Sequence, residues 1–295
     1  MQAFMPVRVV RTTCILLVVV VLGACSSTRL AYRFADQGVL WWVDDYVTLT
    51  REQKATLRND LEVLKAWHCE AELPRYSGWL GKLREEMANG ELPPARIEFH
   101  REQVATFAEP LAARIVPVAT SLLGTLSDAQ VEELEVNMAR EQEDRKQEFL
   151  GDDSQQKSAE RIRERTERWL GTLNQRQQTI IDDWTRDRQQ QTRIWLQGRG
   201  HWQQALSELL GERRQADFGP RLRDLILNAP DYQGEAYRNM LEANTRDLTR
   251  LTHDLLQAAD DRHWRTLQKS IASLEQDVSA LACALPDTDE PRPRG

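Results

Sequence analysis

Residues 49–68 read LTREQKATLRNDLEVLKAWH, and this stretch determines the fold class that we expect for the whole chain. Thr50 can accept hydrogen bonds from the free amide groups of a helix N-terminus, and Gln53 can reach back to the amide of Thr50. Leu49 precedes this cap as an apolar staple. One face of the following helix is marked by four residues at spacings of four, three and four: Leu57, Leu61, Leu64 and His68.

The same pattern of Leu, a capping residue, two variable positions and Gln occurs again at residues 126–130 and 173–177. The motif begins at intervals of 77 and then 47 residues, so it does not indicate a solenoid of fixed period. Each copy opens a run with helical periodicity, which helix capping explains without any further role. Whether the motif has a function as well stays open. The capping residues that we predict are Thr50, Gln53, Ser127, Gln130, Asn174 and Gln177.

Helical periodicity continues through the rest of the chain, and no stretch alternates apolar and polar residues with a period of two. Residues 94–126 contain Pro110 and Pro117, so we expect kinks or a broken helix there. Residues 234–283 predict one long final helix, and Gly198 and Gly200 are candidate breaks in an earlier one. The sequence therefore predicts an all-α protein without a sheet, an elongated antiparallel helical bundle.

Charged residues dominate residues 137–168, and 151–154 read Gly-Asp-Asp-Ser, which is typical of a turn. Few large apolar side chains are available there to pack against a core. We therefore expect a solvated helical hairpin at about 127–171 that protrudes from the bundle, with a disordered tip as the alternative.

The amino terminus carries export signals. Arg8 and Arg11 precede an apolar run at 15–22, which is too short to span a bilayer, and the run ends in Leu-Gly-Ala-Cys at 22–25. This ending resembles the bacterial lipobox, which implies that residues 1–24 are removed and Cys25 is lipidated. Ser26 follows this cysteine, and the absence of Asp at that position resembles the sorting rule that sends lipoproteins to the outer membrane. We therefore expect a protein that is anchored there and faces the periplasm. An ordinary secretory signal with an incidental cysteine is the alternative.

Two cysteines remain in the mature chain, Cys69 and Cys283, because Cys14 lies in the signal and Cys25 carries the lipid. In an oxidising compartment such a pair is more often a disulfide than two free thiols. A bridge would close a long loop, and the chain-entropy model predicts that it would stabilise the folded protein by about 5 kcal/mol. Two separately buried thiols are the alternative.

Charge and motifs exclude several functions. The net charge is −7, and removal of Arg8 and Arg11 with the signal makes it −9. An acidic chain with interspersed basic residues argues against a nucleic-acid partner. Phosphate-binding loops, nucleophile elbows and zinc-protease motifs are absent from the sequence, so we expect no enzyme, cofactor, metal or small-molecule substrate.

Three tryptophans, Trp184, Trp195 and Trp202, are separated by eleven and seven residues, which is three turns and two turns of a helix. Such a face could line a ligand groove or a protein-interaction surface. An amphipathic core helix with one polar gap is the more common explanation of this spacing.

Four segments of the first third of the mature chain carry a family resemblance: residues 41–46 (WWVDDY), the following Leu-Thr-x-x-Gln, residues 66–68 (AWH) and residues 72–76 (ELPRY). Together they resemble a family of proteobacterial lipoproteins of unknown function, DUF6279. In relatives basic residues often follow Trp-His, whereas Cys69 and Glu70 stand here. The Leu-Thr-x-x-Gln pattern is also similar to the LTxxQ motif of Spy-type periplasmic chaperones.

Together these features predict residues 25–285 as one helical domain with a disordered tail at 286–295. The expected role is that of a lipid-anchored, non-catalytic protein of the cell envelope that binds the membrane through its anchor and an envelope protein through its surface. A Spy-like chaperone is the alternative, which predicts an exposed apolar concavity lined by tryptophans. An enzyme acting on cell-wall or lipid material is a third, which would need convergent catalytic groups in a cleft.

Overall fold

The computed structural model describes residues 27–90, 92–186 and 188–283, and within them all regular structure is helical. The first half of the chain contains α1 (Ser27–Arg33), α2 (Ala35–Asp44), α3 (Arg51–Trp67), the π-helical turn η1 (His68–Glu72), α4 (Leu73–Glu86), the 3₁₀ turn η2 (Met87–Asn89) and α5 (Pro94–Gly124).

The second half contains α6 (Asp128–Leu150), α7 (Ser154–Leu170), α8 (Gln175–Thr185), α9 (Gln189–Gly211), α10 (Phe218–Leu227), α11 (Ala229–Gln233), α12 (Glu235–Gln257) and α13 (Asp261–Leu281). The predicted all-α fold class is therefore confirmed for the described part of the chain.

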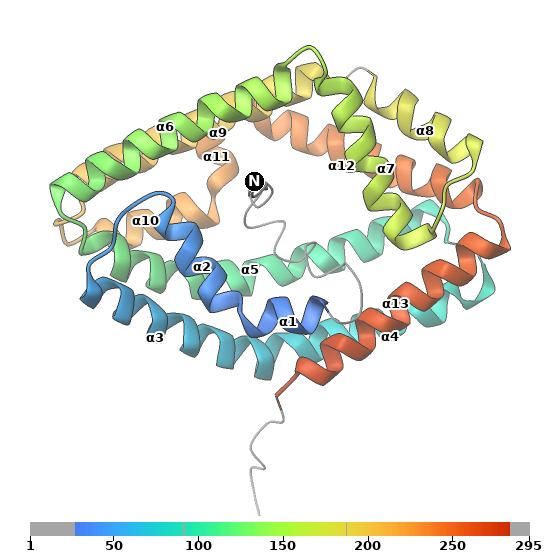
Figure 1. The fold of residues 1–295 in the computed structure, drawn as a ribbon, viewed down its shortest axis with the longest axis horizontal. Helices are drawn as coiled ribbons and strands as arrows, with labels where there is room; N and C mark the ends of the chain where they lie inside the picture. Colours follow the sequence, from blue (N-terminus) through green and yellow to red (C-terminus); the bar gives the residue numbers. More distant parts are fainter. Residues whose placement is uncertain (1–26, 91, 187, 284–295) are drawn as a thin grey trace, which may run out of the picture.

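The long helices follow the outline of an elongated oval (Figure 1). At one end α6, α9 and α10 lie near the start of α3, and at the other α4 and α13 lie near α7 and α8, with α5 and α12 running between the ends. Each end has its own apolar core. The first core contains Leu57, Leu134, Leu210, Leu222 and Leu225. The second contains Leu73, Leu80, Ile181, Leu255 and Ile271.

The helix boundaries differ from the prediction at three places. The final helix is divided at 258–260, where Asp260 caps α13 and begins a new helix. In contrast, α5 is not broken at Pro110 and Pro117, and both prolines lie inside a single 31-residue helix. Helix α9 likewise continues through its two internal glycines.

The charged stretch does form two helices joined at 151–153, but they do not protrude as a hairpin. Helix α6 packs on α9, whereas α7 packs on α8 and α13, so the two helices diverge after the turn (Figure 1). The prediction was wrong because both helices contribute apolar side chains to a core, with Leu134 and Met138 of α6 in the first and Leu170 of α7 in the second. In addition, Glu141 and Arg145 of α6 are buried as a pair rather than solvated.

Candidate functional site

The first two predicted caps form capping boxes and lie against each other. The side-chain oxygens of Gln53 and Gln130 each accept a hydrogen bond from the backbone amide of their own capping residue, Thr50 and Ser127, at 2.9 Å. Each glutamine also donates to the other: Gln53 Nε2 lies 3.2 Å from Gln130 Oε1, and Gln130 Nε2 lies 2.8 Å from Gln53 Oε1. Their second donors reach the carbonyls of the partner cap, at Thr125 and Thr48. Every donor and acceptor of the two amides is therefore used.

The third cap pairs with a fourth that the sequence analysis did not predict. Asn174 and Gln177 form a capping box, and their amide groups donate to the carbonyls of Ala258 (2.8 Å) and Leu255 (3.2 Å). The opposing cap is Asp260, whose capping box has His263 in the glutamine position. The Nε2 atom of His263 lies 3.1 Å from the carbonyl oxygen of Thr172 and donates to it. Asp-x-x-His has the same spacing as the other three caps, with His263 in place of glutamine.

Both cysteines predicted to pair form a disulfide, Cys69–Cys283, with Cα atoms 5.1 Å apart. Cys69 lies inside the π-helical turn, where the amide of Leu73 bonds to the carbonyl of His68 five residues earlier. Pro74 follows directly and would clash with a carbonyl in a regular α-helix, so the wider turn accommodates it. The bridge joins the π-helical turn between α3 and α4 to the residue that follows α13 closely, Cys283. Cys69 itself belongs to the second core.

Next to the disulfide, polar and aromatic side chains gather around the π-helical turn, and we call them the π-turn cluster: Tyr32, His68, Glu72, Arg75 and Tyr76. The hydroxyl of Tyr32 on α1 lies 3.2 Å from His68 Nδ1 and 3.3 Å from the carbonyl oxygen of Lys65. Buried Glu72 accepts both of its bonds from one nitrogen of Arg75, at 2.7 and 2.8 Å. The cluster ties the first described helix to the disulfide-linked turn.

Burial controls the ionisation of this cluster. It raises the pKa of Tyr32 to about 12, and burial together with the charge of Glu72 raises the pKa of Tyr76 to about 12. Burial lowers the pKa of His68, and the neighbouring Glu72 only partly offsets that effect. The cluster is therefore held with neutral tyrosines and a neutral histidine, and it presents no activated nucleophile.

A second buried polar group lies between α6 and α9 and was not predicted. Glu141 accepts two bonds from Arg145, at 2.6 and 2.8 Å, one from Arg199 at 2.5 Å and one from the hydroxyl of Tyr46. Burial would raise the pKa of Glu141, but these donors outweigh it and the pKa is lowered. The spacing of four between Glu141 and Arg145 was visible in the sequence, but it carries no information about burial.

The three predicted tryptophans do not share one exposed face. Trp184 lies on α8 against the second core, with the Arg188 guanidinium 3.8 Å from its ring centre. Trp202 lies on α9 against the first core and donates to the carbonyl of Leu225 at 2.9 Å. Trp195 packs edge-on against Phe149 with ring centres 5.5 Å apart. The helical spacing failed as evidence because α8 ends at Thr185, so Trp184 belongs to a different helix.

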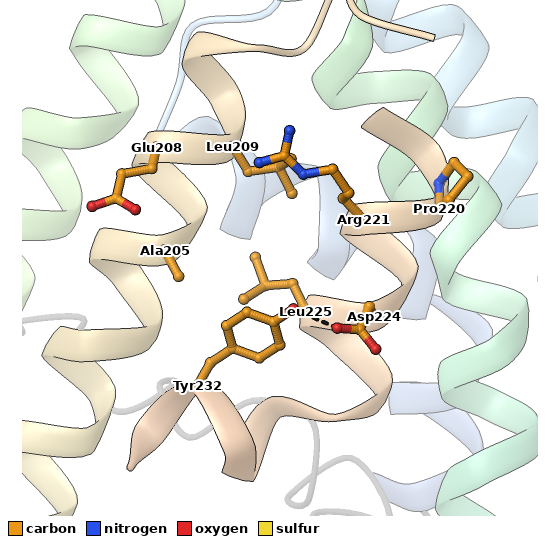
Figure 2. Close-up of a pocket in the computed structure, with 8 residues that line it drawn as sticks. All are labelled: Ala205, Glu208, Leu209, Pro220, Arg221, Asp224, Leu225 and Tyr232. Atoms are coloured by element: carbon orange, nitrogen blue, oxygen red, sulfur yellow. Dashed lines mark hydrogen bonds between the residues drawn. The ribbon is translucent and has the colours of Figure 1, made fainter. Parts of the chain in front are cut away.

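An open pocket of about 420 Å³ lies between α9, α10 and α11 (Figure 2). Leu209, Leu225 and Ala205 form part of its wall, and its polar groups bond to one another or to neighbours. Tyr232 donates to Asp224, which lowers the pKa of that carboxyl, and Arg221 pairs with Glu212 (Figure 2 shows the first of these bonds).

Comparison with known proteins identifies the chain at the family level. A model of the family described as "Family of unknown function (DUF6279)" matches residues 45–238, which is more than half of the chain. The chain belongs to this family. The comparisons with curated proteins and with solved structures found no significant match. The family match includes Cys69 and the three Leu-x-x-x-Gln motifs, whereas Cys283 and the Asp260 cap lie beyond it.

Several predicted features lie outside the described residues. They are the signal at 1–24, the lipidation site Cys25 and the tail at 286–295. Within the described ranges, no helix is both long and apolar enough to cross a membrane. Those ranges also contain no group of three His, Cys, Asp or Glu side chains placed to hold a metal ion.

Proposed function

We propose that this protein is a lipoprotein that is anchored through acylated Cys25 to the outer membrane, faces the periplasm and acts without catalysis through its surface on another envelope protein. The observation that carries this proposal is the sequence Leu-Gly-Ala-Cys directly after the apolar run at 15–22. Helix α1 begins at Ser27, so little chain separates the anchor from the folded body. The Cys69–Cys283 bridge agrees with an oxidising compartment.

The polar clusters favour a structural rather than a catalytic role. The π-turn cluster, the Glu141 group and the pocket beside Tyr232 each satisfy their charges by internal pairing. Internal pairing of this kind holds helices in a fixed arrangement, which suits a protein that presents a rigid surface to a partner.

The chaperone alternative receives less support. It predicts an apolar concavity lined by tryptophans, but Trp184, Trp195 and Trp202 are packed against other side chains. The Leu-x-x-x-Gln motif, which suggested the likeness, is used in capping boxes at each of its three positions. Capping therefore accounts for the motif without client binding.

Acylation of Cys25 can be tested by metabolic labelling with a palmitate analogue in cells that express the full chain. We expect label in the wild type and none in Cys25→Ser. Cys14→Ser is the matched control, because it changes another cysteine of the same amino-terminal segment and should leave labelling intact. Density-gradient separation of the two membranes then locates the protein. An unlabelled wild type would refute the anchor.

The non-catalytic, surface-acting role is separated from the chaperone alternative by light scattering. A thermally unfolding client is heated with the purified protein at several molar ratios. We expect no suppression of aggregation near equimolar ratio. Suppression at that ratio would favour the chaperone, and the indoles of Trp184 and Trp195 would then be the first positions to change.

A further inference from the structure

Helices α1 and α2 carry a stripe of exposed apolar side chains along one side. Leu30, Phe34 and Trp41 are exposed by 58%, 53% and 68% of their surface, and Gly38 lies between them with open space around it. The spacings of four, four and three residues are those of one helix face. Phe34 joins the two helices: its amide donates to the carbonyl of Leu30 at 3.2 Å, and its carbonyl accepts from the amide of Gly38 at 2.9 Å.

The opposite side of the same helices is fixed to the body. Leu40 and Val43 are buried in the first core, and Tyr32 packs on His68. Arg29 pairs with buried Asp277 of α13 at 2.6 Å. The exposed stripe is therefore not the result of a loosely placed segment: the body holds these helices with the apolar face outward. Exposed tryptophan and phenylalanine on such a face call for an apolar or interfacial partner.

The position of the stripe along the chain identifies that partner. Only four residues lie between Cys25 and Leu30, which limits their distance to about 18 Å even in a fully extended chain. The stripe itself is about 16 Å long at the rise of an α-helix. If Cys25 is acylated, as proposed above, the Leu30 end of the stripe is held within about 18 Å of the anchored residue, so the stripe can face the bilayer surface.

We infer that the stripe formed by Leu30, Phe34 and Trp41 rests in the headgroup region of the anchoring membrane and fixes the orientation of the whole molecule. A helix with an apolar face and polar flanks lies in the plane of the interface, where tryptophan is favoured. Arg33 and Gln37 beside the stripe are exposed, and Asp44 pairs with Lys54, so the helix sits at the surface rather than in the hydrocarbon. This inference rests on the proposed acylation of Cys25.

The test uses the full acylated chain in phosphatidylethanolamine–phosphatidylglycerol vesicles, with and without bromine on the acyl chains. Bromine quenches nearby indoles, and the difference between wild type and Trp41→Phe isolates the emission of Trp41. We expect this component to be quenched. Trp42→Phe is the matched control: Trp42 packs against Tyr46, with ring centres 5.3 Å apart, so its component should be unaffected. Phe34→Trp in the Trp41→Phe background should restore quenching.

Flotation of the vesicles distinguishes failure of the anchor from failure of the orientation. A protein that does not float lacks the anchor, which overturns both proposals. A protein that floats but whose Trp41 and Phe34→Trp signals are not quenched is anchored with this face away from the membrane, which overturns the orientation alone. If those signals change with protein density and cross-linking traps dimers, the stripe binds a second copy instead.

Discussion

The paired amides of Gln53 and Gln130 show how much can depend on a single side-chain atom. Each amide nitrogen donates twice and each amide oxygen accepts twice, so a carboxylate of the same shape removes two donors at once. Gln53→Glu would leave the carbonyl of Thr125 without this donor and place two acceptors together. We expect a loss of about 1–3 kcal/mol in urea unfolding. Gln197→Glu, at an exposed position of α9, should change stability little.

The Glu141 group predicts a response to acid. Its lowered pKa means that the folded protein retains the carboxylate where the unfolded chain takes up a proton. The stability that this carboxylate contributes is therefore present above the ordinary glutamate pKa of about 4 and lost as the pH falls below it.

Glu141→Gln should cost about 3–5 kcal/mol at neutral pH, because Arg145 and Arg199 lose a buried partner. It should also make unfolding less sensitive to acid. The check is urea unfolding at several pH values, with Glu143→Gln as the control in an exposed ion pair. An equal acid response in both variants would contradict the assignment.

The two tyrosines of the π-turn cluster predict a response to alkali with the opposite sign. Their pKa values of about 12 lie above the unfolded value of about 10, so the unfolded chain releases its protons first. Stability is complete below the unfolded value and falls as the pH rises through the folded one. Either Tyr32→Phe or Tyr76→Phe should therefore reduce the alkaline loss of stability.

At neutral pH the two tyrosine variants should differ. Tyr32→Phe loses contacts with His68 and Lys65 and should cost about 1 kcal/mol. The Tyr76 hydroxyl is buried without a hydrogen-bond partner in the described structure, so Tyr76→Phe should be neutral or stabilising. Urea unfolding at neutral and alkaline pH measures both effects, and equal costs at neutral pH would be evidence against this arrangement.

At the scale of helices, two glycines of α9 have different roles. A Cβ atom on Gly198 would lie 2.7 Å from the ring of Tyr237, so this glycine allows α12 to approach closely. At Gly200 a Cβ atom would lie 3.8 Å from Gln142 Nε2, which is ordinary contact. Gly198→Ala should destabilise by about 1–3 kcal/mol, whereas Gly200→Ala should stabilise by up to about 1 kcal/mol. Thermal unfolding of the pair compares them directly, and stabilisation by both would contradict this packing.

The sequence predicted those elements whose cause is local. The capping boxes at Thr50, Ser127 and Asn174 depend on residues three positions apart, and each was predicted correctly. The close approach of Tyr237 to Gly198 depends on a contact between distant segments, and the glycine was taken for a break. The amide pairing between caps 77 residues apart also depends on tertiary structure, so local spacing could not reveal it.

At the scale of the whole molecule, pattern alone could not say which helices pack together. Charge along α6 and α7 indicated solvent, yet α6 contributes Val131, Leu134 and Met138 to the first core and α7 contributes Leu170 to the second. The cysteine pair was predictable because only two cysteines remained once the signal and the anchor were assigned. Its consequence, that the segment just after α13 is fastened to the second core, required the fold.

The two cores predict an uneven response to loss of the bridge. Cys283→Ser removes a crosslink over 214 residues at an exposed side chain, and the chain-entropy model gives a loss of about 5 kcal/mol before strain is subtracted. Since Cys69 belongs to the second core, together with residues of α4 and α13, local opening should increase there first. Hydrogen exchange should accelerate in α4 and α13 and change less in α6, α9 and α10, whose packing is in the first core. Uniform acceleration would instead show that both cores open as one unit.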